Sequence, residues 1–364
     1  MNQQLLYQWS DELARHLPSL NSWQVENVAL FSYGLIEAES CQQQSVARQV
    51  VCGERVESAA RRWRRFLSNA AFPLSGFFAE WTRWVVHELN VRAITLLVDE
   101  TKIHARLGVM VVGVAWQGRC IPLAWRAYRA NDAASYPAEG QVALIKGLLE
   151  QVKAGIPETV AVLVLADRGI GTSPDLCRAV DGLGWRYLFR ITCQSKIITD
   201  TGEYTIAHQV QPGEIWHASG VVFKKRGRLR AHARAIWSAG YDQAWVLVTN
   251  DEQLTGHEYA QRNWQEQSFR DLKSGGWHWN DTRIRLADHL ERLLVILAVA
   301  YGWLLALGSQ AVAQGCCQAL LPRADGQPRR QWSVFKEGLR YFYEVVQRHC
   351  VGLQLRFVPD QRFT

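Results

Sequence analysis

The chain lacks the cysteine patterns that hold a structural zinc ion. Its eight Cys are scattered, only Cys316 and Cys317 are close together, and no CxxC or Cys/His ligand spacing occurs. We also expect no secretory or transit peptide, because residues 1–10 are polar and contain no apolar segment. These absences argue against structural zinc and favour the reducing cytoplasm of a cell as the location.

A convincing membrane span is missing as well. The one membrane-like run, residues 293–307, is shorter than the roughly 20 apolar residues that a spanning helix needs. Gly302 interrupts it, and three charged residues precede it, namely Asp288, Glu291 and Arg292. We expect a buried core helix here and no membrane partner. Internal repeats and low-complexity tracts are also absent.

The composition is that of a soluble, folded globular protein whose positive charge suits a polyanionic partner without proving one. The 364 residues are 48% hydrophobic and 21% charged, enough for two or three domains with a sizeable core. The net charge is +7 and the isoelectric point about 9.0, which suits a polyanion. Sixteen Trp are available for cores or for stacking on unpaired bases.

The first part of the chain, residues 1–90, has apolar residues at helical spacing and a basic cluster. Five arginines fall within eleven residues of this region: Arg55, Arg61, Arg62, Arg64 and Arg65. A solvated helix face would explain them. We favour a helical DNA-binding domain in which Arg61, Arg62 and Arg65 contact the DNA backbone.

From residue 91 the pattern changes to strands. Short apolar runs at 94–98 and 160–166 end at Asp99 and Asp167, respectively. Further strands are expected at 107–116, 121–128, 187–191, 215–223, 229–237 and 244–249, with a helix at 142–152 and another starting with Ser173 as its cap. The pattern divides the chain into an α/β region at 91–190, a β-rich insertion at 191–250, a second α/β part at 251–310 and a C-terminal helical region at 311–364.

Residues 259–273 contain no Gly or Pro, so we expect one continuous helix. At 100° per residue, one narrow face carries the carboxylate of Glu266 together with Tyr259, Arg262, Arg270 and Lys273. Ion pairs on a solvated face are the plain alternative. A carboxylate that can hold a metal ion, set among phosphate-seeking donors, is what phosphodiester chemistry requires.

Two strand-end aspartates and one helical glutamate form a candidate acidic cluster: Asp99, Asp167 and Glu266. Magnesium takes oxygen ligands and leaves room for water and phosphate oxygens. Each aspartate alone would more often be a turn or cap residue. Strand alternation points Glu100 to the other face, whereas Asp271 and Asp281 remain alternative third ligands on spacing alone.

These residues resemble a known family. The motifs that carry the resemblance are Asp99-Glu100-Thr101, Ala166-Asp167-Arg168-Gly169-Ile170-Gly171, and Tyr259, Arg262, Glu266 and Lys273 in the spacing Tyr-x2-Arg-x3-Glu-x6-Lys. They look like bacterial DDE insertion-sequence transposases of the IS-four-like group that bears a YREK motif. The resemblance covers about residues 91–310.

The resemblance implies an RNase H-like core with a β-rich insertion, in which Asp99, Asp167 and Glu266 are catalytic and bind two Mg²⁺ ions, with Mn²⁺ as a substitute. It implies cut-and-paste transposition: cleavage at the terminal inverted repeats of double-stranded DNA, then joining of the 3′ hydroxyl ends to target DNA. Tyr259, Arg262 and Lys273 would hold phosphates, with Arg270 beside them. A homodimer on DNA in the nucleoid of a bacterium is expected, since two ends are cut together.

Two other functions stay open at this point. One is another RNase H-like nuclease or resolvase, and the other is a catalytically silent DNA-binding protein derived from a transposase. Within the insertion, Trp216, Trp237 and Trp245 lie beside a basic stretch, Lys224, Lys225, Arg226, Arg228 and Arg230. We expect Trp216, which follows a Pro-Gly turn, to contact DNA rather than the other two.

Overall fold

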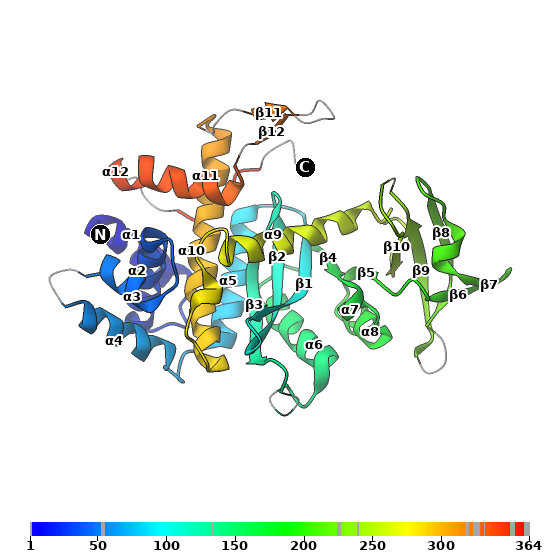
Figure 1. Ribbon diagram of the computed structural model, residues 1–364, viewed down its shortest axis with the longest axis horizontal. Helices are drawn as coiled ribbons and strands as arrows, with labels where there is room; N and C mark the ends of the chain where they lie inside the picture. Colours follow the sequence, from blue (N-terminus) through cyan, green and yellow to red (C-terminus); the bar gives the residue numbers. More distant parts are fainter. Residues whose placement is uncertain are drawn as a thin grey trace.

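The computed structural model of the protein describes residues 2–359, apart from 52–54, 133, 135, 224–226, 239, 317–319, 323–327, 331 and 350–353 (Figure 1). It is a mixed α/β fold built around one sheet of ten strands in the order β3-β2-β1-β4-β5-β10-β9-β8-β6-β7. In the parallel pairs, β1 and β5 both pair with β4, whereas β2 and β3 join in antiparallel fashion.

The strands follow the expected apolar runs closely. They are β1 (Ala93–Ile103), β2 (Leu107–Trp116), β3 (Arg119–Arg129), β4 (Ala161–Ala166), β5 (Arg186–Arg190), β6 (Lys196–Thr199), β7 (Gly202–Thr205), β8 (Ile215–Val222), β9 (Leu229–Ile236) and β10 (Trp245–Thr249). The sequence did not indicate β6 and β7, which have four residues each and are largely half-exposed. The β-rich insertion does not form a sheet of its own, because β10 pairs with β5 and extends the central sheet.

Helices precede, cover and follow the sheet. They are α1 (Gln3–His16), α2 (Ser22–Ala38), α3 (Gln43–Gln49), α4 (Val56–Leu67), α5 (Leu74–Leu89), α6 (Gly140–Lys153), α7 (Arg168–Gly171), α8 (Pro174–Gly182), η1 (Ile206–Gln209), η3 (His257–Arg262), α9 (Asn263–Leu272), η4 (Trp279–Asp281), α10 (Ala287–Ala313), α11 (Val334–Tyr341), η5 (Phe342–Val346) and α12 (Gln347–His349). The C-terminal region, expected to be helical, also contains a small sheet of β11 (Leu320–Pro322) and β12 (Pro328–Arg330).

Helix α10 is the central helix of the core. It is long and apolar enough to span a membrane, yet its most apolar window is wholly buried inside the protein, as expected for residues 293–307. Figure 1 shows it between helices α1–α4 and the sheet. The indole N–H of Trp125 on β3 donates to the carbonyl of Glu291 on α10 at 3.0 Å, which fixes the helix against the sheet.

Two details differ from the sequence-based expectations. Strand β1 does not end at Asp99 but continues to Ile103, because its antiparallel pairing with β2 continues to the hairpin turn. The expected continuous helix at 259–273 is also broken. Its first turn is the 3-10 helix η3, in which the Tyr259 N–H donates to Gly256 O, and α9 begins only at Asn263.

Candidate active site

The register of two parallel strands places two aspartates side by side. The pairing of β1 with β4 ends at Val98 opposite Ala166, so Asp99 and Asp167 follow at the same edge. Side chains alternate along a strand, and Leu97 and Leu165 are both buried in one smaller apolar cluster. Asp99 and Asp167, two residues further on, therefore lie on that same face of the sheet.

The turn after β4 explains the Asp-Arg-Gly-Ile-Gly motif. The carboxylate of Asp167 caps α7 by accepting a hydrogen bond from the Ile170 N–H at 3.0 Å. A Cβ atom at Gly171 would lie 2.6 Å from the carbonyl oxygen of Arg190. Because glycine alone allows this close approach, the turn packs on β5 and holds Asp167 at the sheet edge.

Helix α9 is fixed to the sheet through the face opposite its glutamate. The hydroxyl of Ser268 accepts from the Cys120 N–H at 2.7 Å, and Asp271 pairs with Arg119 and accepts from the hydroxyl of Tyr301. These contacts commit Asp271 to a structural role away from the acidic edge. They leave Glu266 pointing outward, with its side chain 46% exposed.

Arg262 lies between the three acidic side chains. Its Nη2 is 2.9 Å from Oδ2 of Asp99 and 3.6 Å from Oδ2 of Asp167, and its Nη1 pairs with Oε1 of Glu266. Its Nε is buried and has no hydrogen-bond partner. The three expected catalytic acids thus converge from β1, β4 and α9, and one guanidinium neutralises part of their charge.

Burial governs the electrostatics of this cluster. Asp99 is 8% exposed, and burial raises its pKa to about 6, although Arg262 opposes the rise. Burial lowers the pKa of Arg262, but the surrounding acids outweigh it and the net shift is upward. Burial lowers the pKa of Lys273, whose Nζ donates to Oγ1 of Thr101 at 2.7 Å on the same strand as Asp99.

The acids line an open pocket of about 450 Å³ with most of the expected phosphate-binding side chains. Arg262, Arg270 and Lys273 lie in its wall. Thr101, Ser274 and Asn280 also line it, although none of them was expected as a site residue and only Thr101 belongs to a quoted motif. Thr101 could have been found by strand alternation, because it lies two residues beyond Asp99 on the same face.

The remaining expected site residues do not line the acidic pocket. Tyr259 is only 5% exposed and packs edge-on against Trp245, at a centroid distance of 5.2 Å. Trp216 lies on β8 and is partly buried against the main core. The alternative ligand Asp281 is outside the acidic pocket and lies 3.6 Å from His278.

The arginines of α4 do not behave alike. Arg62 donates to Oδ1 of Asn27 at 2.8 Å and pairs with Glu26, so α2 holds it. Arg61 contacts the hydroxyl of Ser58, and Arg65 is exposed. The expected basic residues Lys224, Lys225 and Arg226 lie outside the described residues.

The chemistry of the acidic pocket fits a hard divalent cation, but its present arrangement does not. Three carboxylates offer the oxygen ligands that magnesium prefers. Among the described residues, however, no group of three His, Cys, Asp or Glu is arranged to hold one metal ion. The guanidinium of Arg262 lies where the acids converge, so it would have to withdraw before a cation could bind there.

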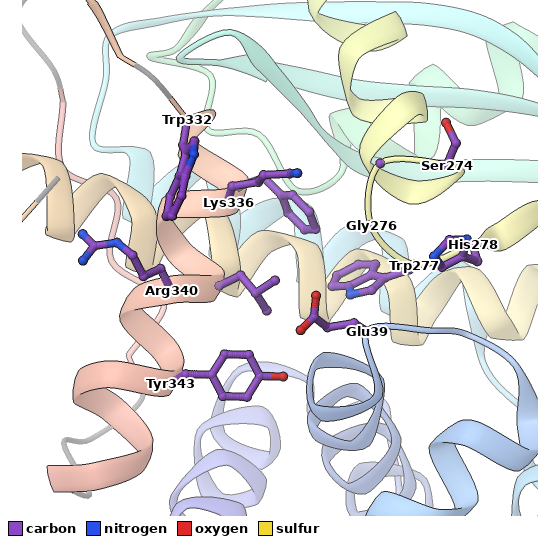
Figure 2. Close-up of a pocket in the computed structure, with 12 residues that line it drawn as sticks. Glu39, Ser274, Gly276, Trp277, His278, Trp332, Lys336, Arg340 and Tyr343 are labelled. Atoms are coloured by element: carbon purple, nitrogen blue, oxygen red, sulfur yellow. The ribbon is translucent and has the colours of Figure 1, made fainter. Parts of the chain in front are cut away.

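A second cavity of about 500 Å³ shares Ser274 with the acidic pocket. Figure 2 shows Trp332, Lys336, Arg340 and Tyr343 on one wall, facing the loop of Trp277 and His278. Arg340 is already paired with Glu337 and Glu344, so this cavity carries less free positive charge than its residues suggest.

Comparison with known proteins agrees with the geometry. Residues 132–303 match the model of a family described as the transposase DDE domain. This match includes Asp167 and Glu266 and begins after Asp99. No curated protein matches the chain. The match supports a DDE transposase, and such a domain implies a DNA-cleaving enzyme.

Proposed function

We propose that this chain is a bacterial transposase of the IS-four-like, YREK-bearing group, which cuts transposon ends and joins their 3′ hydroxyls to target DNA. The observation that carries the proposal is the convergence of Asp99, Asp167 and Glu266 on one pocket. They come from three elements far apart in the sequence, and the domain match extends across two of them.

The strand order supports an RNase H-like core within the mixed α/β fold. Strands β3-β2-β1-β4-β5 form a contiguous half of the sheet, with β1, β4 and β5 mutually parallel and β2 antiparallel to both of its neighbours, β1 and β3. We assign residues 91–190 and 251–310 to this core, 191–250 to the insertion, and 1–90 to a DNA-binding region.

Asp99, Asp167 and Glu266 would hold two Mg²⁺ ions, or Mn²⁺ in their place. Bound there, the ions would activate the attacking oxygen and stabilise the leaving oxygen of a phosphodiester. The protein contributes the fixed positions of the carboxylates: Asp99 by strand register, Asp167 by the cap of α7, and Glu266 by the anchored helix α9.

The basic side chains around the pocket would bind the DNA backbone. Arg270 and Lys273 line the pocket, and Arg262 becomes available to a phosphate once it leaves the acids. Tyr259 is buried beside Arg262. We expect it to orient the Arg262 side chain without contacting DNA itself. The partners are double-stranded DNA and a second copy of the chain on DNA, in the cytoplasm of a bacterium.

The test uses plasmid DNA carrying candidate terminal repeats from the sequences that flank the reading frame. We expect cleavage at the repeats with Mg²⁺ or Mn²⁺, and none with Ca²⁺ or excess EDTA. Robust cleavage in EDTA would sink the metal assignment. Cleavage without regard to the repeats would instead favour an RNase H-like nuclease, and repeat binding without cleavage would favour a silent DNA-binding derivative.

A further inference from the structure

A basic groove lies near the acidic pocket, and apart from Arg64 and Asp281 its lining residues were not singled out in the sequence. It encloses about 820 Å³ between the α3–α4 region and the segment that joins η4 to α10. Its apolar floor includes Trp63 and Leu67, both buried. Its walls carry Arg64, Arg283, Arg285 and His289 together with side-chain amides from residues 42–44.

One wall presents two arginines in a regular way. The segment 282–286 is extended at both ends, with Thr282 buried and Ile284 packed against the core. Arg283 and Arg285 alternate with these residues and are exposed. In an extended chain, alternate residues are about 7 Å apart on the same side, so the two guanidiniums can reach successive phosphates of one strand.

The opposite wall adds a third unpaired cation. Arg64 is exposed on α4, and buried Trp63 and Leu67 fix the orientation of that helix. Among the residues that the structure describes, none forms a hydrogen bond or ion pair with the side chains of Arg64, Arg283 or Arg285. Asp281 is the one acidic residue among those lining the groove, and it lies beside His278.

The groove and the acidic pocket have lining residues that are neighbours in the sequence. Asn280 lines the acidic pocket and the next residue, Asp281, lines the groove. This junction is fixed, because Trp279 is fully buried and the His104 ring pairs with the carbonyl of Asn280. We therefore expect a DNA duplex whose scissile phosphate lies at the acids to reach the guanidiniums of Arg64, Arg283 and Arg285 beyond the pocket.

We propose that this groove binds the phosphate backbone of the duplex that flanks the cleavage position. The proposal rests on the proposed function, since it takes DNA as the substrate of the acidic pocket. It assigns the backbone contact of the N-terminal region to Arg64, and adds Arg283 and Arg285 from the linker before α10. This replaces the expectation that Arg61 and Arg65 contact the DNA backbone: neither lines the groove, and together they serve as the matched comparison.

The first test compares two double variants that each remove two positive charges, Arg283→Gln/Arg285→Gln and Arg61→Gln/Arg65→Gln. Binding of a fluorescein-labelled duplex is followed by anisotropy across a salt series, with EDTA present so that no cleavage occurs. Each lost phosphate contact lowers the slope of log K against log salt by about 0.9, so we expect the groove variant to lower it by about two. The control variant should change it by less than half of that.

The second test locates the DNA without relying on affinity. Leu286 is 47% exposed at the groove, and Tyr7 is 70% exposed on α1, which does not line it. We expect Leu286→Cys to be alkylated by a maleimide several-fold more slowly when duplex DNA is bound, and Tyr7→Cys to be alkylated equally fast. Peptide mapping by mass spectrometry separates these positions from the native cysteines.

The outcomes distinguish this proposal from the one on which it rests. Failure of the wild-type protein to bind any duplex would overturn the proposed function itself. Normal DNA binding with an unchanged slope in Arg283→Gln/Arg285→Gln, or with Leu286→Cys unprotected, would overturn the groove while leaving the transposase proposal in place. An equal loss of slope in the Arg61→Gln/Arg65→Gln control would overturn it too.

Discussion

The two halves of the ten-stranded sheet are built differently, although they share one hydrogen-bonded ladder. In the inner half, β1 to β5, helices α6, α9 and α10 pack on the strands, and β2 is buried along nearly its whole length. In the outer half, β8 alternates between exposed and half-buried residues, and the short helix η1 packs on β9. The acidic pocket lies in the inner half, where parallel strands end together between covering helices.

The comparison teaches why the chemistry is placed where it is. A strand covered on both faces has a nearly continuous apolar sequence. A charged side chain at the end of such a strand lies in an environment of low dielectric constant. Asp99 shows the effect, since burial raises its pKa to about 6. A strand with one wet face offers no such environment, so acids there remain ordinary surface groups.

The largest expected effect contrasts acids in the two halves. Asp99→Asn, Asp167→Asn or Glu266→Gln should each lower the rate of end cleavage about 10³-fold or more, because a lost metal ligand removes roughly 4 kcal/mol of transition-state stabilisation. Asp200→Asn, on an exposed residue between β6 and β7, should leave the rate unchanged. Cleavage is measured with gel-shift binding run in parallel, and full cutting by any of the three would remove that residue from the catalytic set.

Packing should show the same contrast in stability. Leu165 on β4 is fully buried, so Leu165→Ala should cost about 4 kcal/mol in the free energy of unfolding. Ile215 on β8 is 51% exposed, and Ile215→Ala should change stability by less than about 0.5 kcal/mol. Urea denaturation followed by circular dichroism measures both. Equal losses in the two variants would contradict the contrast, because they would mean that Ile215 is buried in solution, for example against a second copy of the chain.

Much of the inner half was predictable because its signals are strong. Uninterrupted apolar runs indicated β2, β3 and β4, and Ser173, expected as a helix cap, does cap α8. The apolar run at 293–307 indicated a buried helix, and α10 extends beyond that run at both ends. The strands β6 and β7 escaped because four mixed residues carry too little periodicity to tell a strand from a loop.

The pairing of Arg262 was beyond reach of the sequence for a different reason. Helical spacing put Arg262 and Glu266 on one face, and they do pair. Its contact with Asp99 joins positions 163 residues apart and depends on how α9 crosses the end of β1. Likewise, the sequence around Arg62 does not indicate that its side chain binds Asn27 and Glu26 on another helix.

Removing the guanidinium at the acidic pocket should sharpen the comparison further. Arg262→Ala leaves buried Asp99 without its partner, so we expect a loss of about 3 kcal/mol in EDTA, the lower end for a broken buried pair. Magnesium should raise the melting temperature of this variant more than that of the wild type, since a cation no longer competes with the guanidinium. Arg270→Ala, an exposed residue of the same pocket, is the control and should change neither value. A smaller magnesium effect in Arg262→Ala than in wild type would contradict competition for one place.

The smallest effect is expected at Trp216, in the outer half. Its strand β8 is four positions from β4 in the sheet, about 19 Å away, and its ring is partly buried against the core. We therefore expect Trp216→Ala to weaken binding to a transposon end by about 1 kcal/mol, the lower end of what one stacked base contributes. With 2-aminopurine near the transposon end, the variant complex should be brighter than the wild-type complex, because a stacking partner that quenches the probe is lost.

Trp245→Phe is the control from β10, where the ring packs on Tyr259 beside the acids. Unchanged fluorescence in Trp216→Ala together with a change in Trp245→Phe would place the DNA contact on β10, the strand that pairs with β5. Strand β8 would then have no part in DNA binding.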